Sequence, residues 1–377
     1  MPKQVISESA DLEALLVGLG IMGTGGGGDP KGWGRSVFDA DLEAGRAYEL
    51  VDPGSIPDDA FVASGGYLGS VADDRGLNRV IAGWEDEFEL EYAIRMLEEE
   101  HGRRADYLVA FELGGGNTPV VMSCASRRGI PVIDGDGVGR AAPETHMCSF
   151  LGHGISLTPM PLAGEDGTRI VVRSGDLFLA DAIGRCVAGR KGGFLANAHY
   201  GMSGADLKRS VVCGSVTRAL ELGRLVRGLT PEEDPLERVS DFIGGTPLLR
   251  GRVISRREIE QLGFFTAHVE IEDRLPNRTE RLTLVIKNEV MCVKREDTPL
   301  VLFPDLVYVL DPASGEGVMS TELVEGREVD ILGAPCAPAV RRAIESEAGR
   351  VAFASERYGE SYEFVPMEDL LASEGGA

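Results

Sequence analysis

Short apolar runs alternate with glycine-rich loops in the first half of the chain. Residues 107–111 and 130–133 have the length and composition of strands. The segment between them, residues 120–128, has the length of one helix, with Asn117 and Thr118 as candidate caps and Gly129 as a stop. This order of strand, glycine loop, helix and strand predicts a βαβ unit, in which a right-handed crossover joins two parallel strands.

Two polar loops would leave these strands at the same carboxyl edge of the sheet, ELGGGN at residues 112–117 and DGDGVGR at residues 134–140. Ligands of open α/β sheets bind at this edge, and glycines let a ligand approach the backbone. Six polar residues are therefore expected to converge on one crevice: Glu112, Asn117, Asp134, Asp136, Arg140 and Glu144. In the alternative interpretation the two aspartates only form turns, and Arg140 is their ion-pair partner on the surface.

A third glycine-rich loop, residues 20–30, follows an amphipathic helix expected at residues 9–19. The loop lacks the GK[ST] ending of a P-loop and no clear strand precedes it, so a phosphate cradle is disfavoured. We expect it to bring Thr24, Gly26 and Asp29 to a site, with a plain hinge as the alternative.

The pattern changes in the second half of the chain. A helix is expected from Ser203 to about Arg227, and strand-length apolar runs separated by turns follow from Arg252. We place the domain boundary at residues 163–167, giving domains 1–165 and 166–377, and expect a frayed tail from about residue 368. The predicted fold is an α/β N-terminal domain with βαβ units and glycine-rich loops, followed by a C-terminal α+β, largely β domain.

Composition narrows the classes of partner. The net charge of −23 argues against nucleic acid and anionic membrane surfaces, and no apolar run reaches the length of a membrane span. No signal-peptide pattern is found near the N-terminus, so we expect a cytoplasmic protein. The six cysteines form no CxxC pair, which excludes a zinc ribbon and gives no disulfide framework. We expect a homo-oligomer that binds a small molecule and neither nucleic acid nor membrane.

Several residues could carry chemistry. Carboxylates and an imidazole could hold a divalent metal such as zinc or manganese, although their spacing matches no named motif. The candidate metal ligands are Asp134, Asp136, Glu144 and His146. Cys148, close to His146, could be a thiolate nucleophile, but a small buried residue is the favoured interpretation. His199 could reach a site between the domains, although a lone histidine is more often structural.

Four motifs in combination resemble the S-methyl thiohydantoin desulfurase family, which is related in context to hydantoinase/oxoprolinase proteins. They are IMGTGGGGDP at residues 21–30, ELGGGN at 112–117, PVIDGDGVGR at 131–140 and PE at 143–144. Similarity continues at KNE (287–289), PDL (304–306) and the strand region 326–333, so it covers about residues 9–351. The sequence departs from the family pattern at residues 68–74, which read LGSVADD, and at His146.

The resemblance implies a cleft between an α/β and a largely β domain, in which an S-methyl thiohydantoin is hydrolysed to a hydantoin and methanethiol. Such a reaction needs a base, a charge stabiliser and an acid for the leaving group. The expected catalytic residues are Asp134, Asp136 and Glu112, and the expected substrate-binding residues are Thr24, Gly26, Asp29, Asn117, Arg140, Glu144 and His199. Two alternatives remain open: a non-catalytic partner subunit of a hydantoinase/oxoprolinase-like complex, and a metal-dependent hydrolase of another cyclic amide.

Overall fold

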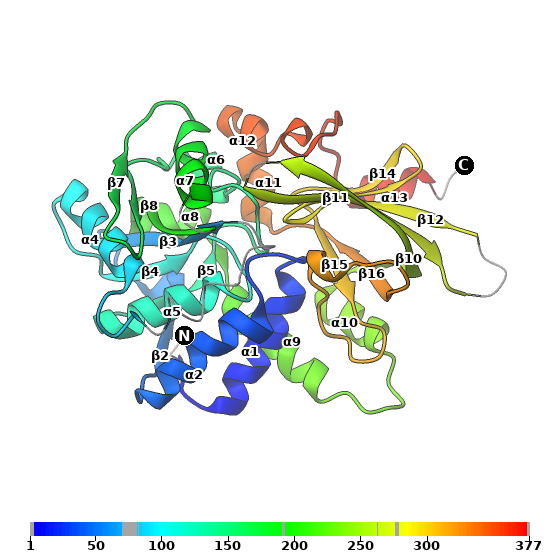
Figure 1. The fold of residues 1–377 in the computed structure, drawn as a ribbon, viewed down its shortest axis with the longest axis horizontal. Helices are drawn as coiled ribbons and strands as arrows, with labels where there is room; N and C mark the ends of the chain where they lie inside the picture. Colours follow the sequence, from blue (N-terminus) through cyan, green and yellow to red (C-terminus); the bar gives the residue numbers. More distant parts are fainter. Residues whose placement is uncertain are drawn as a thin grey trace.

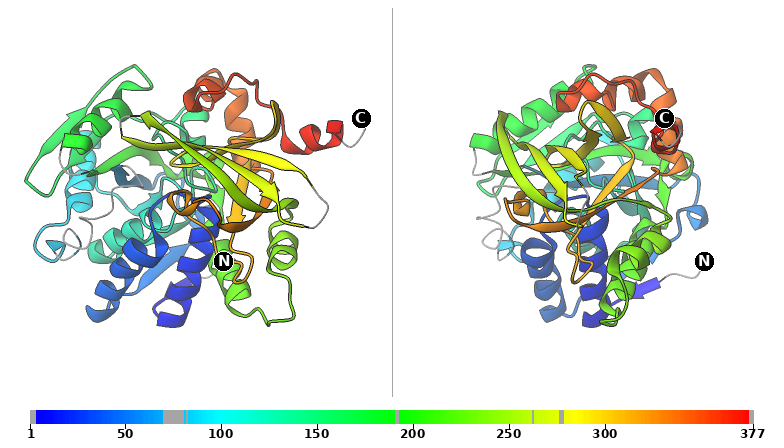
Figure 2. Two further views of the ribbon diagram at one scale, coloured as in Figure 1. Left: turned by 45° about the vertical axis from the view of Figure 1, so that its right-hand side comes forward. Right: turned by 90° about the vertical axis from the view of Figure 1, so that its right-hand side faces the viewer.

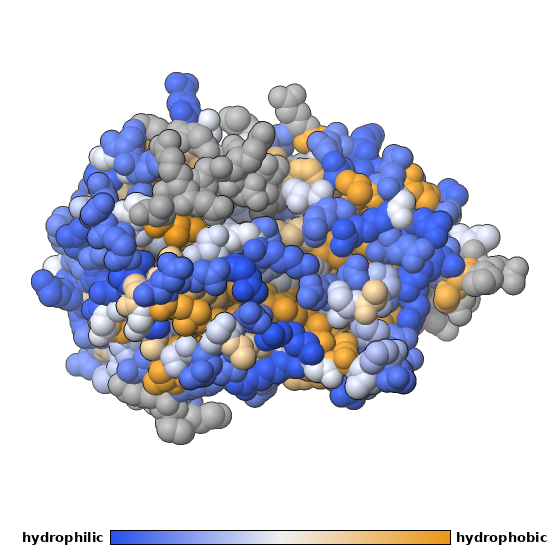
Figure 3. Space-filling view, turned by 60° about the horizontal axis from the view of Figure 1, so that its bottom comes forward, coloured by the Kyte–Doolittle hydropathy of each residue, from blue (hydrophilic) through white to orange (hydrophobic). Residues whose placement is uncertain are grey.

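Two β-sheets lie side by side in the computed structural model, each with helices packed against it (Figure 1). The structure describes residues 4–69, 81, 83–190, 193–261, 263–275 and 279–374. None of the described helices is long and apolar enough to cross a membrane. Hydrophilic residues cover most of the face drawn in Figure 3, and hydrophobic residues form interrupted patches on it.

The first sheet has the order β1-β2-β5-β4-β3-β8-β6-β7, with β9 paired to β5. Strands β2, β5, β4 and β3 are parallel, and the strands on either side of them are antiparallel. Its strands are β1 (Gln4–Ile6), β2 (Tyr48–Val51), β3 (Phe61–Gly69), β4 (Tyr107–Ala110), β5 (Val132–Asp136), β6 (Met160–Ala163), β7 (Arg169–Val172), β8 (Phe194–Ser203) and β9 (Val212–Cys213).

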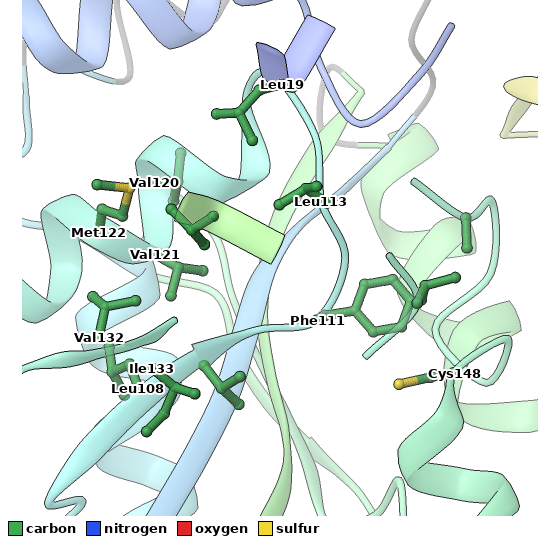
Figure 4. Close-up of a cluster of buried hydrophobic side chains, with 14 of the residues drawn as sticks. Leu19, Leu108, Phe111, Leu113, Val120, Val121, Met122, Val132, Ile133 and Cys148 are labelled. Atoms are coloured by element: carbon green, nitrogen blue, oxygen red, sulfur yellow. The ribbon is translucent and has the colours of Figure 1, made fainter. Parts of the chain in front are cut away.

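The predicted βαβ unit is confirmed. Strands β4 and β5 pair in parallel through Leu108 and Val132, and helix α5 (Asn117–Arg128) connects them. The helix ends at Gly129, whose φ of 66° is the left-handed conformation that glycine adopts without strain. Apolar side chains of α5, β4 and β5, including Val120 and Ile133, pack into one buried cluster (Figure 4). The carboxyl ends of the two strands are therefore fixed relative to each other.

Helices cover both faces of this sheet. In Figure 1, α1, α2, α5 and α9 lie below it and α7 lies above it. The helices associated with the first sheet are α1 (Ser9–Met22), η1 (Pro30–Gly34), α2 (Arg35–Glu43), η2 (Pro53–Ser55), α4 (Glu89–His101), α6 (Ser149–Gly152), α7 (Leu179–Arg190), α8 (Gly204–Ser210) and α9 (Ser215–Arg227).

The second sheet is entirely antiparallel, with the order β14-β13-β12-β11-β10-β16-β15, which confirms the largely β C-terminal part. Its strands are β10 (Thr246–Gln261), β11 (Phe264–Asp273), β12 (Arg281–Lys287), β13 (Glu289–Arg295), β14 (Thr298–Leu302), β15 (Leu306–Leu310) and β16 (Glu328–Ala334). Helical elements around it are α10 (Pro235–Ile243), η3 (Ser320–Glu322), α11 (Pro338–Glu345), α12 (Glu347–Ala352), η4 (Ser355–Tyr358) and α13 (Met367–Glu374).

The C-terminal segment returns to the first domain. Helix α11, drawn in orange in Figure 2, packs on α6. The ring Nε2 of His153 lies 3.0 Å from the carbonyl oxygen of Ala339. The larger hydrophobic core likewise continues from the first sheet into the second, where Phe303 and Tyr308 belong to it. The two sheets therefore share a buried, well-packed interface.

Two sequence predictions about elements are wrong. The single helix expected from Ser203 to Arg227 is broken into α8 and α9, because residues 212–213 pair with β5 and Gly214 adopts a φ of 72°. Of the tail expected to be frayed from about residue 368, residues 368–374 belong to helix α13, which Met367 anchors by donating its N–H to Asp305 at 2.8 Å, and residues 375–377 lie outside the described residues. Tertiary contacts override local sequence signals at both places.

The predicted domain boundary at residue 165 falls between β6 and β7, which are neighbours in the first sheet. The first domain contains the first sheet, whose last strand ends at Cys213. The second domain contains the second sheet, which begins at Thr246.

Candidate active site

A small pocket of about 60 Å³ lies where the first sheet meets the second. Most of the lining comes from the first domain: Gly27, Gly28, Asp29, Trp33, residues 65–69, Phe111, Glu112, Asn117, Ala142, Pro143, Thr145, Arg185 of α7, Phe194, Asn197 and His199. The second domain contributes Asn288 and Glu289, at the turn between β12 and β13. The pocket therefore adjoins the carboxyl end of the parallel strands, where α/β sheets bind ligands.

The two glycine-rich loops pack against each other backbone to backbone beside this pocket. The carbonyl oxygen of Gly27 accepts hydrogen bonds from the N–H groups of Gly116 (2.9 Å) and Asn117 (3.1 Å). A Cβ on Gly114 would lie only 2.5 Å from the Cα of Gly27, so no larger residue fits there without movement. Close approach of two chain segments therefore accounts for these glycines.

The predicted residues of the first glycine loop take different positions. The carboxylate of Asp29 lines the pocket and accepts the N–H groups of Lys31 and Gly32, which caps η1. Gly26 lies directly against the side chain of Glu289. Thr24 is buried outside the lining, and its carbonyl oxygen accepts the N–H of Val290 at 3.1 Å.

Glu112 is held in the pocket by donors from two loops. One carboxylate oxygen accepts the side-chain amide of Asn117 at 2.7 Å, and the other accepts the N–H of Ala142 at 2.6 Å. Asn117 is itself fixed, because its amide exchanges two hydrogen bonds with the backbone of Tyr67 on β3. Glu112 and Asn117 are thus brought together as expected, with Asn117 orienting the carboxylate.

Glu289, which the sequence analysis did not place in the site, enters the pocket from the second domain. It is 2 % exposed, its Oε1 accepts the N–H of Gly27 at 3.2 Å, and its Oε2 is buried with no hydrogen-bond partner in the described part of the chain. The available signal was the KNE motif at residues 287–289, which carries part of the family resemblance.

Both carboxyl groups have strongly perturbed acidity. Burial raises the pKa of Glu112 to about 7, with a further contribution from the nearby Asp136. Burial and the carboxylate of Glu112 raise the pKa of Glu289 to about 8. Near neutral pH this pair can hold one proton and one negative charge, which is the combination that concerted acid and base catalysis requires.

His199 forms part of the pocket wall. Its ring meets that of Phe111 edge to face at 5.4 Å, and its Nδ1 is buried with no hydrogen-bond partner among the described residues. Burial lowers the pKa of His199 to about 3, so the imidazole is neutral at physiological pH. A neutral imidazole next to an apolar ring can accept or donate a hydrogen bond to a small ligand.

Arg185 also reaches the pocket, but its guanidinium is already engaged. It binds Asp181 at 2.8 Å and the carbonyl oxygens of Gly69 and Gly263, each at 3.1 Å, and it also donates to the carbonyl oxygen of Pro143. Its role in the described structure is to join α7, β3 and the second domain around the pocket.

Arg140 lies outside the pocket lining, although it is fully buried. Its guanidinium donates to three backbone carbonyl oxygens, those of Ala141 (2.9 Å), Asp305 (3.0 Å) and Val290 (2.7 Å). Burial lowers the pKa of Arg140 to about 10. The described contacts make Arg140 a link between the loop after β5 and the second domain.

The two aspartates of β5 also lie outside the lining. Asp134 accepts the N–H and hydroxyl of Thr217 at 3.0 and 2.6 Å, which fixes the first turn of α9. Asp136 accepts the N–H groups of Val138 and Gly139, both at 2.6 Å, and burial raises its pKa to about 6. Both carboxylates therefore organise backbone next to the site.

Glu144 binds two cations in the interface. Its Oε2 lies 3.0 Å from Nζ of Lys287, and Arg357 contacts both carboxylate oxygens. Burial opposes ionisation, but His146 in its protonated form, Arg357 and Lys287 outweigh it and lower the pKa of Glu144. His146 lies 3.7 Å from Glu144, burial lowers its pKa to about 4, and neither ring nitrogen has a hydrogen-bond partner among the described residues.

The four predicted metal ligands do not form one ligand set. Asp134 contacts α9, Asp136 contacts the loop after β5, and Glu144 with His146 faces the second domain. In the part of the chain that the structure describes, no three His, Cys, Asp or Glu side chains are arranged to hold a metal ion.

Cys148 is buried and donates its thiol to the carbonyl oxygen of Gly137 at 3.6 Å. Burial raises the pKa of this thiol well above its usual value. Thiolate chemistry requires the opposite shift, so the contacts favour the small buried residue over the nucleophile.

Comparison with known proteins identifies a family and a similar solved structure. Residues 10–174 match the N-terminal domain family described as S-Me-THD-like, and residues 175–367 match the corresponding C-terminal domain family. An X-ray crystal structure of a protein from Chromobacterium violaceum is similar, with a TM-score of 0.75 and 24% identity over 97% of this chain and 100% of that one. That likeness supports the fold. No curated protein matches the chain.

Proposed function

The chain belongs to the S-Me-THD-like, or S-methyl thiohydantoin desulfurase, family, and on that premise we propose that its pocket hydrolyses S-methyl thiohydantoin-type rings to hydantoins and methanethiol. The observation that carries the proposal is the pair of buried carboxyl groups, Glu112 and Glu289, which meet in one pocket from different domains. Their raised pKa values suit them to exchange protons near neutral pH.

The reaction needs two proton transfers at the ring carbon that bears sulfur. Glu112, as carboxylate, would accept a proton from water while the water oxygen bonds to this carbon. Glu289, as carboxylic acid, would protonate the adjacent ring nitrogen, which receives the electron pair of the C=N bond. The Asn117 amide and the Ala142 N–H keep Glu112 oriented during this step.

Collapse of the tetrahedral intermediate completes the balance. The new hydroxyl returns its proton to Glu289 as the C=O bond forms and the C–S bond breaks, and the methanethiolate takes the proton held by Glu112. One water is consumed, the products are a hydantoin and methanethiol, and both carboxyl groups regain their starting states. The buried setting supports this sequence because charge interactions are stronger where water is excluded.

The test is a thiol-release assay with the purified full chain and an S-methyl thiohydantoin, with the hydantoin identified by mass spectrometry. Glu112→Gln and Glu289→Gln should each lose at least about 10²-fold in turnover, because each removes a proton-transfer group. Asp41→Asn is the matched control, because Asp41 is a buried carboxylate that binds Tyr48 and Arg127 away from the pocket.

Other outcomes identify the rival functions. Thiol release that disappears after chelation would support a metal-dependent hydrolase and contradict the carboxyl pair. Binding of the ring without turnover, together with co-purification of a larger chain, would support a partner subunit of a hydantoinase-like complex.

A further inference from the structure

We propose that Glu144 is a positioning residue, which acts through Lys287 and Arg357 to hold Glu289 in the pocket. The turn between β12 and β13 contributes Glu289, and this turn is anchored to the first domain by an ion cluster at Lys287. The inference rests on the proposed function only for its activity measurements, because the position and acidity of Glu289 can be measured without turnover.

The ion cluster joins three distant parts of the chain. Lys287 ends β12, Glu144 belongs to the loop after β5, and Arg357 belongs to η4 near the C-terminus. Nζ of Lys287 lies 3.0 Å from Oε2 of Glu144 and donates to the carbonyl oxygen of Arg357 at 2.8 Å. Nε of Arg357 lies 3.1 Å from Oε2 of Glu144, and Nη2 of Arg357 contacts Oε1 of Glu144.

The centre of this cluster is buried, so it depends on charge pairing. The side chains of Lys287 and Glu144 are only 2 % and 5 % exposed. Two further titratable groups lie beside them. Burial lowers the pKa of His146 to about 4, so it supplies no compensating charge at neutral pH, and the carboxylate of Asp181 is already bound by Arg185. Removing the carboxylate of Glu144 would leave the buried ammonium of Lys287 unpaired beside the guanidinium of Arg357, which is 27 % exposed, and an unpaired buried charge is strongly destabilising. The turn would move to relieve this repulsion.

The backbone transmits that movement to Glu289 over two residues. Asn288 adopts a left-handed φ of 58° and is paired with Phe265, whose N–H it accepts through its side chain at 2.8 Å. Val290, on the other side of Glu289, donates to Thr24 and accepts from Arg140. Glu289 thus lies between two residues held by hydrogen bonds, Asn288 and Val290, and Lys287 directly precedes the first of them.

The charged groups around Glu289 make its position measurable. Glu112 faces it from the loop after β4, Arg140 from the loop after β5 and Arg185 from α7, while Gly27 donates an N–H to it. Burial and Glu112 together raise the pKa of Glu289 to about 8. If Glu289 leaves this position it gains water and moves away from Glu112, so its pKa must fall toward the ordinary value of a glutamic acid.

The primary experiment is a titration of the full chain labelled with ¹³C at glutamate side-chain carboxyl carbons. The Glu289 signal is assigned by its loss in Glu289→Gln. We expect the Glu289 midpoint to fall by about one pH unit or more in Glu144→Gln. An unchanged midpoint in a folded Glu144→Gln protein would overturn the inference.

Two further variants serve as a second test and as a control. Arg357→Met keeps the Glu144–Lys287 pair, so it should shift the Glu289 midpoint in the same direction but less, and it carries the test if Glu144→Gln does not fold. Asp330→Asn removes a buried carboxylate paired with Arg274 in the same domain, outside the pocket. It should lose stability and leave the midpoint unchanged, and an equal shift there would overturn the specific role of Glu144.

Activity adds a readout that a purely structural role would not move. In Glu144→Gln we expect kcat to fall by about tenfold or more with KM little changed, and the alkaline limb of the rate profile to move to lower pH. A rise in KM with an unchanged alkaline limb would contradict positioning. Wild-type protein that releases no thiol would refute the proposed function, while the titration would still decide the role of Glu144.

Discussion

Replacing Gly26 by alanine tests whether the first glycine loop sets the position of Glu289. The added Cβ would lie 1.9 Å from Oε1 of Glu289, whereas Cβ atoms essentially never approach another heavy atom within 3.0 Å. The carboxylate must therefore retreat by about 1 Å. Gly26 does not have a positive φ, so the substitution adds no backbone strain of its own.

The displacement has two expected costs. A misplacement of about 1 Å at a reacting group can lower the rate by about 10²-fold, so kcat in the thiol-release assay should fall by that order. The hydrogen bond from Gly27 to Glu289, 3.2 Å long, would also be lost, and an unsatisfied buried group costs about 1–3 kcal/mol in the free energy of unfolding. Urea denaturation measures this second effect.

The matched control is Gly189→Ala on α7, where an added Cβ has no heavy atom within 4 Å. This variant should retain turnover and change the free energy of unfolding by no more than about 1 kcal/mol, because alanine is the better helix former. Wild-type turnover in Gly26→Ala would refute the claim that the loop determines where Glu289 acts.

Three further predictions follow from the described contacts. The pH dependence of kcat/KM should be bell-shaped with its maximum between about 7 and 8, because Glu112 must be ionised and Glu289 protonated; a rate that rises steadily to pH 10 would contradict this assignment. Arg140→Met should lower the free energy of unfolding by more than about 2 kcal/mol, since three carbonyl oxygens lose a charged donor. Arg252 and Glu328 form an exposed ion pair, so Arg252→Met should lose less than about 1 kcal/mol; chemical denaturation compares the two variants. Cys148→Ser should retain most of the wild-type turnover, and iodoacetamide should not inactivate the native protein. Loss of activity in a folded Cys148→Ser protein would instead support Cys148 as a thiolate nucleophile.

Local sequence patterns were sufficient for the part of the site built on one βαβ unit. Residues 107–133 predict two parallel strands and the helix between them, so Glu112 and Asn117 could be placed together at one sheet edge. The same patterns could not show which way a guanidinium points. Arg140 stands next to the expected crevice in sequence, but three backbone carbonyl oxygens from both domains hold it in the interface.

Contacts between distant segments account for what the sequence analysis missed. Glu289 is hydrogen-bonded to Gly27, 262 residues away, and no periodicity or motif spacing reports such a contact. The break of the expected 203–227 helix has a similar cause, because residues 212–213 pair with β5, far earlier in the chain. Local propensity describes single elements, whereas these features depend on which elements meet in three dimensions.

The central claim is that Glu112 and Glu289 act as one acid–base unit, and the most direct measurement is thiol release by four proteins at the optimal pH. These are the wild type, Glu112→Gln, Glu289→Gln and the double variant. We predict that each single variant loses at least about 10²-fold in kcat/KM. The double variant should be little less active than the less active single variant, because the effects of removing groups that act together do not add. Wild-type rates in either single variant, or losses that multiply in the double variant, would contradict the account.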